Sequence, residues 1–278
     1  MSEAGALGMI GLPMISADAV ADIFDGVAKA TPNPVGGNFL MPFVDPAAVE
    51  AAASRARLVE FFYGDPEQKL VDLVHGGGAL AAWQIGDPEE AKAARDAGCD
   101  VVVAQGVEAG GHVRGTTGLL PLLDEVLEAV GDTTPVVAAG GIGTASALKA
   151  VLVAGADGAR VGTRFVATEE ADTHPVYAQA LVDADAQDTV LTPAFGVMWP
   201  DAPHRVLRSC IEAAEAVTDE TVGEMAMGDM RMPLPKFAVP CPARSTTGNI
   251  AAMALYAGQS VGAVTKVGRA ADVVRELT

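Results

Sequence analysis

Short apolar runs alternate with amphipathic stretches over the first part of the chain, up to about Phe165. The apolar runs have the length of β-strands and lie near residues 8, 36, 59, 81, 102, 137 and 160. Helical patterns between most of these runs cover residues 46–56, 65–74, 87–97, 120–129 and 144–153. Because strands that are buried on both faces read as continuous apolar runs, the alternation predicts a parallel sheet that helices cover.

A glycine separates several helical patterns from the apolar run that follows. The segment that starts at Ala97 reads Ala-Gly-Cys-Asp, and the segment that starts at Ala154 reads Ala-Gly-Ala-Asp. Glycine suits the end of a helix that turns into a parallel strand. The repeat therefore predicts helix ends at Gly98 and Gly155.

The number of apolar runs is one short of a closed eight-stranded barrel. Ser2 to Gly5 reads as the end of a helix whose beginning is absent. We therefore expect a TIM-type (β/α)8 barrel that lacks its first strand. Because such a gap leaves the edges near Met9 and Val161 unpaired, we expect that the gene product starts upstream of Met1, or that another segment or a homo-oligomer closes the gap.

One domain is expected to cover residues 1–278, because about 250 residues suffice for such a barrel. The barrel core of this domain would cover about residues 1–168, and a mostly helical or irregular segment would cover about residues 169–278. No strand is expected after Phe165. Helices are expected near residues 203–217, 246–256 and 269–277.

The composition excludes several partners. The 36 acidic and 18 basic residues give a formal charge of −18, which argues against nucleic acid and against anionic membrane surfaces. Three widely spaced cysteines fit neither a zinc site nor a disulfide framework. The N-terminus resembles neither a secretory signal nor a transmembrane helix. We expect a cytoplasmic protein with reduced thiols and no bound metal.

Two glycine-containing turns follow the last two apolar runs, at Gly140–Gly141 and at Gly162–Thr163. Parallel strands end at the same edge of a sheet, so both turns are expected there. Backbone N–H groups of such turns bind anions, and barrels often hold a phosphate on the loops after their last two strands. The alternative is that these glycines only make tight turns.

His112 lies among glycines in the segment 105–115, directly after the run at 101–104. The glycines let the backbone approach a planar ligand, and the position places the imidazole at the edge that carries barrel chemistry. Histidine titrates near neutrality and suits proton transfer or anion stabilisation. The alternative is an exposed loop histidine. Glu108 either orients His112 or is a solvated carboxylate.

The other basic residues near these motifs are expected to have structural rather than catalytic roles. Arg160 and Arg164 flank the second glycine turn and are expected to pair with acids on the outer surface. His204, Arg205 and Arg208 have helical spacing, which favours one solvated helix face.

Several motifs taken together resemble the nitronate monooxygenase family of FMN-dependent barrels. These motifs lie at residues 103–112, 136–143, 161–167, 174–175, 188–192 and 256–259. The resemblance implies that the flavin phosphate lies on the two glycine turns and that four further residues contact the flavin. The residues concerned are Gly140, Gly141, Gly162 and Thr163 for the phosphate, and Asn38, Gln84, Gln105 and Gly110 for the other contacts. It also implies that His112 is the catalytic residue.

The resemblance implies oxidation of a nitronate, or of the neutral nitroalkane, by O₂ to a carbonyl compound and nitrite. FMN would supply the redox chemistry, and His112 would hydrogen-bond the nitro oxygens or remove the α-proton. Two alternatives remain open: a flavin-dependent enoyl reductase that uses NAD(P)H, and a degenerate barrel that binds flavin without turnover.

Overall fold

Seven strands form one sheet in the structure, a computed structural model that describes residues 1–227 and 230–278. The strand order is β1-β2-β3-β4-β5-β7-β8, and β1 to β5 pair in parallel. The strands are β1 (Gly8–Gly11), β2 (Val35–Leu40), β3 (Leu58–Phe62), β4 (Leu80–Ile85), β5 (Val101–Gln105), β7 (Val136–Ala139) and β8 (Gly158–Arg160). All seven predicted strands are confirmed.

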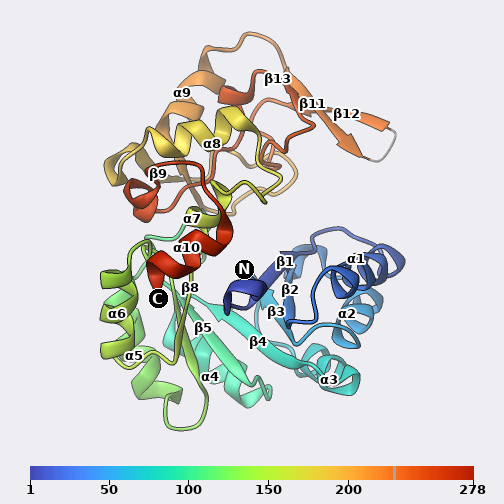
Figure 1. Cartoon of the computed structure of the whole chain (residues 1–278), viewed down its shortest axis with the longest axis vertical. Helices are drawn as coiled ribbons and strands as arrows, with labels where there is room; N and C mark the ends of the chain where they lie inside the picture. The colour runs from blue at the N-terminus through green and yellow to red at the C-terminus, as the bar shows by residue number, and fades with distance from the viewer. Residues whose placement is uncertain (228–229) are drawn as a thin grey trace. The chain divides into compact units, whose positions relative to one another are not determined.

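Helices connect these strands along the chain (Figure 1). They are α1 (Ala17–Ala30), α2 (Pro46–Ala53), α3 (Gln68–Gly77), α4 (Pro88–Asp96), α5 (Leu119–Val130) and α6 (Ala145–Val153). Local chemistry starts several of them: Asp45 and Asp87 each accept a backbone N–H at a helix start, and a proline follows each as the first helical residue. The five predicted helices are confirmed, with shifts of up to a few residues at their ends.

The Gly-x-Asp motif occurs at residues 98–100 and 155–157, and it stabilises the fold in two ways. Gly98 and Gly155 have φ of 91° and 108°, the left-handed conformation predicted for the end of a helix. Two residues later, Asp100 accepts the backbone N–H of Ala81 at 2.8 Å, and Asp157 accepts that of Val136 at 2.8 Å. Each repeat therefore ends a helix and also hydrogen-bonds the neighbouring strand.

The chain divides into two compact units, which are described separately below. The first unit comprises residues 1–105, 117–138 and 150–159, and the second comprises residues 106–116, 139–149 and 160–278. The loops after β5, β7 and β8 thus belong with the C-terminal part of the chain. These loops therefore pack against segments that lie far away in the sequence.

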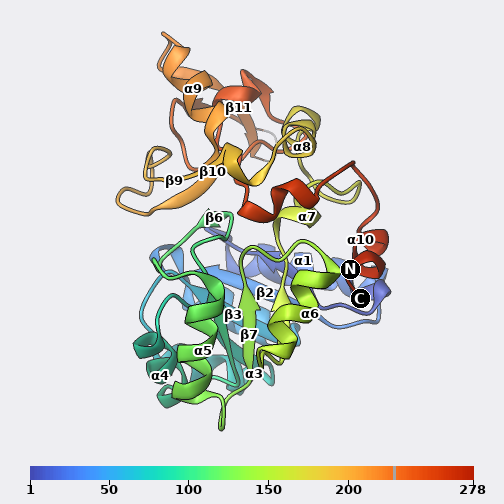
Figure 2. The same cartoon turned by 90° about the vertical axis from the view of Figure 1, so that its left-hand side faces the viewer.

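One face of the sheet in the first unit packs against helices. Phe39, Phe61 and Trp83 lie side by side on β2, β3 and β4, with ring centroids 6.2 Å and 4.8 Å apart. Gly37 lies on the same face, and a Cβ atom there would be 3.3 Å from Phe24 of α1. In the view of Figure 2, α5 and α6 lie on either side of β7.

The expected absence of strands after Phe165 is wrong. The second unit contains β6 (Gly111–His112), β9 (Thr189–Thr192) and β10 (His204–Leu207) in one sheet and β11 (Thr221–Met227), β12 (Met230–Pro235) and β13 (Thr247–Gly248) in another. Its helices are α7 (Thr163–Val166), α8 (Pro175–Val182), α9 (Arg208–Ala216) and α10 (Ala270–Leu277). Pro233 and Pro235 disfavour a helix but are tolerated in β12, which is an edge strand of its sheet.

Two of the three predicted C-terminal helices are confirmed in part or in full. Residues 208–216 and 270–277 are helical, but residues 204–207 form a strand and residues 246–256 contain only a short 3₁₀ turn at Ile250–Ala252. The residues of β10 are buried on both faces, so no alternation of polar and apolar side chains reveals the strand. Helix α8 was not predicted.

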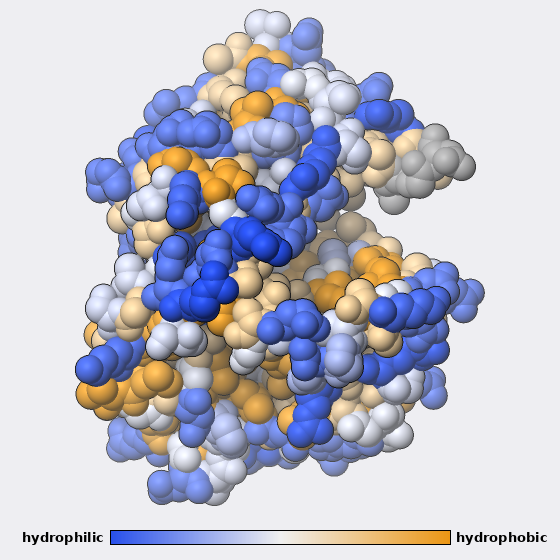
Figure 3. All heavy atoms as spheres, viewed as in Figure 1, coloured by the Kyte–Doolittle hydropathy of each residue, from blue (hydrophilic) through white to orange (hydrophobic). Residues whose placement is uncertain are grey.

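The face of the molecule in Figure 3 is mostly hydrophilic, in keeping with the excess of acidic residues. Hydrophobic residues gather at the lower left of this view, over α5 and α6. Leu120 of α5 and Leu152 and Val153 of α6 are exposed. Of the helices in the described residues, none combines the length and the apolar character that crossing a bilayer requires.

Candidate active site

His112 lies on a strand of the second unit and not in a free loop. The two-residue strand β6 pairs antiparallel with β10, so that His112 faces His204 and Gly111 faces Arg205. Strand β10 pairs on its other side with β9. The backbone of His112 is therefore held by a segment about ninety residues further along the chain.

Aromatic rings surround the imidazole of His112. The Trp199 ring stacks on it, with centroids 4.0 Å apart and an interplanar angle of 20°. The rings of His204 and Tyr256 lie at 5.3 Å and 5.7 Å. Tyr256 is fixed in turn because its hydroxyl donates to the Val239 carbonyl at 2.7 Å. The imidazole thus has a defined orientation, which a catalytic group requires and an exposed loop histidine lacks.

This environment keeps His112 neutral. Burial, and then the neighbouring His204, lower the pKa of His112 from 6.5 to about 3. A stacked indole favours a cation by about 0.5–2 kcal/mol, so Trp199 opposes this effect without reversing it. At neutral pH the imidazole therefore offers one N–H donor and one nitrogen acceptor.

His204 is a structural histidine. It is fully buried, and its Nε2 accepts the backbone N–H of Phe195 at 3.1 Å while its Nδ1 donates to the Ala202 carbonyl at 2.9 Å. These contacts assign the neutral form with the proton on Nδ1. Burial lowers the pKa of His204 as well.

Arg205 supports the loop that carries His112. Its Nε and Nη2 donate to the Val107 carbonyl at 3.1 Å and 2.7 Å, and its Nη1 donates to Thr189 at 3.4 Å. The prediction that His204 and Arg205 lie on a solvated helix face is wrong, because both lie on β10 and are buried. Burial lowers the pKa of Arg205, and the nearby Glu108 opposes that shift.

Gly110 lies against the C-terminal segment 256–259. A Cβ atom on Gly110 would be 2.3 Å from the Gly258 nitrogen, so only glycine fits. The Gln259 N–H donates to the Glu108 carbonyl at 2.9 Å, and the Gly258 N–H donates to the Thr163 hydroxyl at 3.0 Å. The structure therefore brings Gly110, Thr163 and the segment 256–259 together within the second unit.

Gly140 and Gly141 form a left-handed turn, with φ of 103° and 68°. A Cβ atom on Gly140 would be 3.0 Å from the Gly106 carbonyl oxygen, so this glycine also permits close packing. Arg164 joins the two glycine turns, because its Nη1 donates to the Gly143 carbonyl at 2.6 Å. Arg164 also pairs with Glu276, which confirms the predicted pairing with an acid.

Gly162 differs from the other glycines of these loops. A Cβ atom there would meet no atom within 4 Å, and the backbone has φ of −109°, which other residues adopt. Packing therefore does not explain this glycine. Open space beside a backbone N–H at a strand end is what a bound anion needs, so the residues present fit a phosphate.

Asn38, Gln84 and Gln105 share one face of the sheet in the first unit. In the register of the parallel strands, Asn38 is the neighbour of Glu60, Glu60 is the neighbour of Ala82, and Gln84 is the neighbour of Val103. Because side chains alternate along a strand, Gln84 and Gln105 lie on the same face as Asn38 and Glu60. This face is opposite to the helix-packed aromatic rings. Glu60 was not predicted as a site residue, although a carboxyl group within an apolar strand was the available signal.

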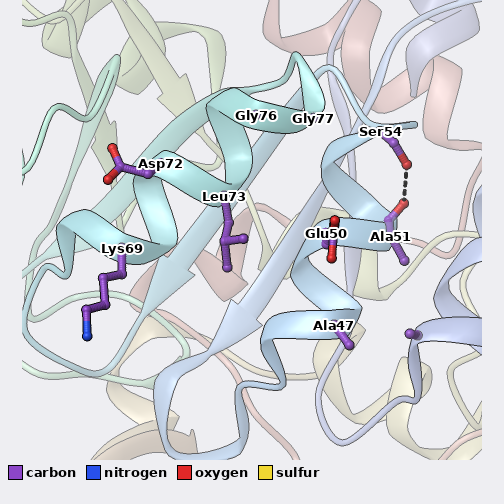
Figure 4. Close-up of a pocket in the computed structure, with 10 residues that line it drawn as sticks. Ala47, Glu50, Ala51, Ser54, Lys69, Asp72, Leu73, Gly76 and Gly77 are labelled. Carbon is purple, nitrogen blue, oxygen red and sulfur yellow. Dashed lines mark hydrogen bonds between the residues drawn. The ribbon is translucent and has the colours of Figure 1, made fainter.

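A groove of about 980 Å³ lies elsewhere on the first unit, between α2 and α3 (Figure 4). Leu73 points toward the gap between these helices, whereas Asp72 points away from it. None of the predicted site residues lines this groove. Across the described part of the chain, no cluster of three His, Cys, Asp or Glu residues could hold a metal ion.

The parallel strands, the covering helices and the glycine turns at the carboxyl ends of the strands define an α/β fold of the TIM-barrel type. A family model described as Nitronate monooxygenase matches residues 41–278, and the chain belongs to this family of flavin-dependent oxidoreductases. The resemblance seen in the sequence is confirmed.

Two solved structures and one curated protein show how far the similarity extends. FabK from Thermotoga maritima has a TM-score of 0.79 and 26% identity over 99% of this chain and 85% of FabK. Nitroalkane oxidase from Streptomyces ansochromogenes has a TM-score of 0.77 and 28% identity over 99% of this chain and 88% of the oxidase. An octahydroindene carboxyl-CoA dehydrogenase of Mycobacterium tuberculosis is 32% identical over 75% of this chain and 58% of the dehydrogenase. The chain spans only 60% and 58% of the length of two curated relatives.

The half-buried His112 and the fully buried His204, both neutral, predict that acid destabilises the second unit. In the unfolded chain a histidine titrates near pH 6.5, whereas the folded pKa of His112 is about 3 and that of His204 is also lowered. Below pH 6.5 the unfolded chain therefore binds protons that the folded chain does not, and the free energy of unfolding falls as the pH falls toward 3. The expected slope is at most about 1.4 kcal/mol per pH unit for each histidine.

Denaturant unfolding between about pH 7.5 and about pH 5 measures this slope. His204→Gln should make it shallower, because one of the two titrating groups is removed. A free energy of unfolding that stays constant over this range would contradict the neutral assignment.

Proposed function

We propose that the chain acts as an FMN-dependent oxidoreductase that oxidises nitronates with O₂ to carbonyl compounds and nitrite. The observation that carries the proposal is the neutral imidazole of His112, which lies after the fifth parallel strand and is held by β10 and Trp199. Family membership supports a flavin, and the likeness to a nitroalkane oxidase supports a nitro substrate.

The protonation state of His112 favours a nitronate over a neutral nitroalkane. A base whose conjugate acid has a pKa of about 3 is weak at neutral pH, so it removes an α-proton poorly. A nitronate has already lost that proton and needs only a hydrogen-bond donor at its nitro oxygens. The N–H group of neutral His112 supplies such a donor, and we expect nitronate turnover to exceed nitroalkane turnover.

The backbone N–H groups of Gly141 and Gly162 would bind the phosphate of FMN, with Gly140 and Thr163 shaping the turns. Asn38, Gln84, Gln105 and Gly110 would be further contacts. When bound, FMN would supply the two-electron chemistry, and the protein would supply position, hydrogen bonds and exclusion of water.

The likeness to FabK over 99% of the chain supports a second candidate, a FabK-like reductase that takes electrons from NAD(P)H. Two measurements on the purified protein separate the candidates. Oxygen uptake on a nitronate supports the oxidase, and anaerobic bleaching of the flavin absorbance by NADH or NADPH supports the reductase. Bound flavin with neither activity would indicate a binding protein without turnover, and absence of flavin binding would exclude all three.

Gly162→Val tests the phosphate position. The new side chain enters space that is empty of protein atoms, so the fold should tolerate it, but it would occupy the place proposed for the phosphate. We expect FMN affinity to fall by about tenfold or more, since charge-assisted hydrogen bonds are lost. Gly76→Val on α3 is the matched control, because that glycine is also open and lies outside the proposed site. Unchanged FMN affinity in Gly162→Val would place the phosphate elsewhere.

A further inference from the structure

The carboxyl group of Glu60 lies in the interior of the first unit, and the proposed mechanism does not use it. Glu60 lies in the middle of β3 and is 2% exposed. Acidic residues are almost never fully buried unless a partner compensates them. The burial of Glu60 therefore requires a hydrogen-bond partner that compensates the loss of water.

Asn38 is the hydrogen-bonded neighbour of Glu60. The two residues are paired in the register of β2 and β3, and Asn38 Nδ2 donates to Glu60 Oε1 at 2.7 Å. A carboxylate oxygen only accepts hydrogen bonds, so the amide nitrogen of Asn38 has to face it. Glu60 thereby fixes the orientation of an amide that could otherwise turn over.

The fixed amide has a defined hydrogen-bonding edge. One N–H of Asn38 is used by Glu60, and the carbonyl oxygen together with the second N–H form the remaining edge. Gln84 and Gln105 lie on the same sheet face and are each 5% exposed. A buried strand face of an α/β protein is usually apolar, so this polar row is suited to a planar ligand that both donates and accepts.

We propose that Glu60 is a positioning residue that orients Asn38 to recognise the N–H and carbonyl edge of a pyrimidinedione ring. The pyrimidine part of a flavin carries such an edge, in which the N3–H group lies between two carbonyl groups. Asn38 would accept from N3–H and donate to an adjacent carbonyl oxygen. The inference rests on the proposed function, since it deepens flavin binding, and it concerns recognition of the ring rather than of the phosphate.

The test compares FMN with FMN that is methylated at N3, titrated into the flavin-free protein and followed by quenching of flavin fluorescence. Methylation removes the N–H donor and adds bulk at that edge. We expect the protein to bind FMN about tenfold or more tightly than the methylated form, as loss of one buried hydrogen bond implies. Glu60→Gln should reduce this ratio to within about threefold of unity, because a glutamine allows both orientations of the Asn38 amide.

Glu50→Gln is the matched control. Glu50 is exposed on α2, so the same substitution should leave the ratio unchanged. Asn38→Ala alone should bring the affinity ratio close to one. If Glu60 acts through Asn38, adding Glu60→Gln to Asn38→Ala should not change this ratio further. If Glu60→Gln does not fold, Glu60→Asp withdraws the carboxylate from Asn38 and should lower the ratio as well.

The outcomes separate the inference from the proposed function. Equal affinity for both ligands in the unchanged protein, or a full ratio retained in every folded Glu60 variant, would overturn the inference and leave FMN binding intact. Failure of the unchanged protein to bind either ligand would overturn both.

Discussion

Replacing His112 with alanine is expected to lower turnover of the best nitronate by about 10²–10⁴-fold, the usual contribution of a positioned acid, base or donor. The imidazole is held by the pairing of β6 with β10 and by the Trp199 ring, and alanine keeps the strand but removes the ring. Flavin content should remain unchanged, since His112 is proposed to act on the substrate. Steady-state oxygen uptake and the flavin absorbance measure the two quantities.

His75→Ala provides the control for this substitution. His75 is a surface histidine on α3 that pairs with Asp100 and lies outside the proposed site. Its replacement should leave turnover within about twofold, as expected for a surface change. A loss below about tenfold in His112→Ala would show that His112 is structural.

Gly110→Ala is expected to destabilise the second unit and to displace the loop that carries His112. The added Cβ atom would be 2.3 Å from the Gly258 nitrogen and 2.7 Å from the Ala257 carbonyl carbon. Both are backbone atoms, so no side-chain rotation relieves the overlap. We expect a loss of about 1–3 kcal/mol in the free energy of unfolding, measured by denaturant titration, together with a loss of turnover.

The opposite result is expected for Gly26→Ala in α1. That glycine lies inside a helix, and an added Cβ atom would meet no atom within 4 Å. Alanine has the higher helix propensity, so this control should be more stable by about 0.5–1 kcal/mol. Wild-type stability in Gly110→Ala would show that the contact with segment 256–259 is not needed.

The parts of the candidate site that lie within one short stretch of sequence could be predicted. These parts are His112 among glycines and the turns at Gly140 and Gly162, and the family resemblance could also be recognised from the residues. The residues that hold the site in place could not be predicted. Arg205 donates to the carbonyl of Val107, which is 98 residues away, and Trp199 stacks on His112 from another distant segment. Contacts of this kind depend on how the segments come together, and no local pattern encodes them.

The sequence by itself determined the seven strands, five of the six helices between them and the glycine helix ends, whereas helix α1 was not predicted. These features follow from the spacing of apolar residues, from helix capping and from glycines in the left-handed backbone conformation. Each of these effects acts over only a few residues. Tertiary structure alone decided that residues 204–207 form a strand, because both of its faces are buried and its pairing partner is β6. It also decided that His112 is neutral and that Glu60 orients Asn38, since burial and the facing partner set both the charge of a group and its hydrogen bonds.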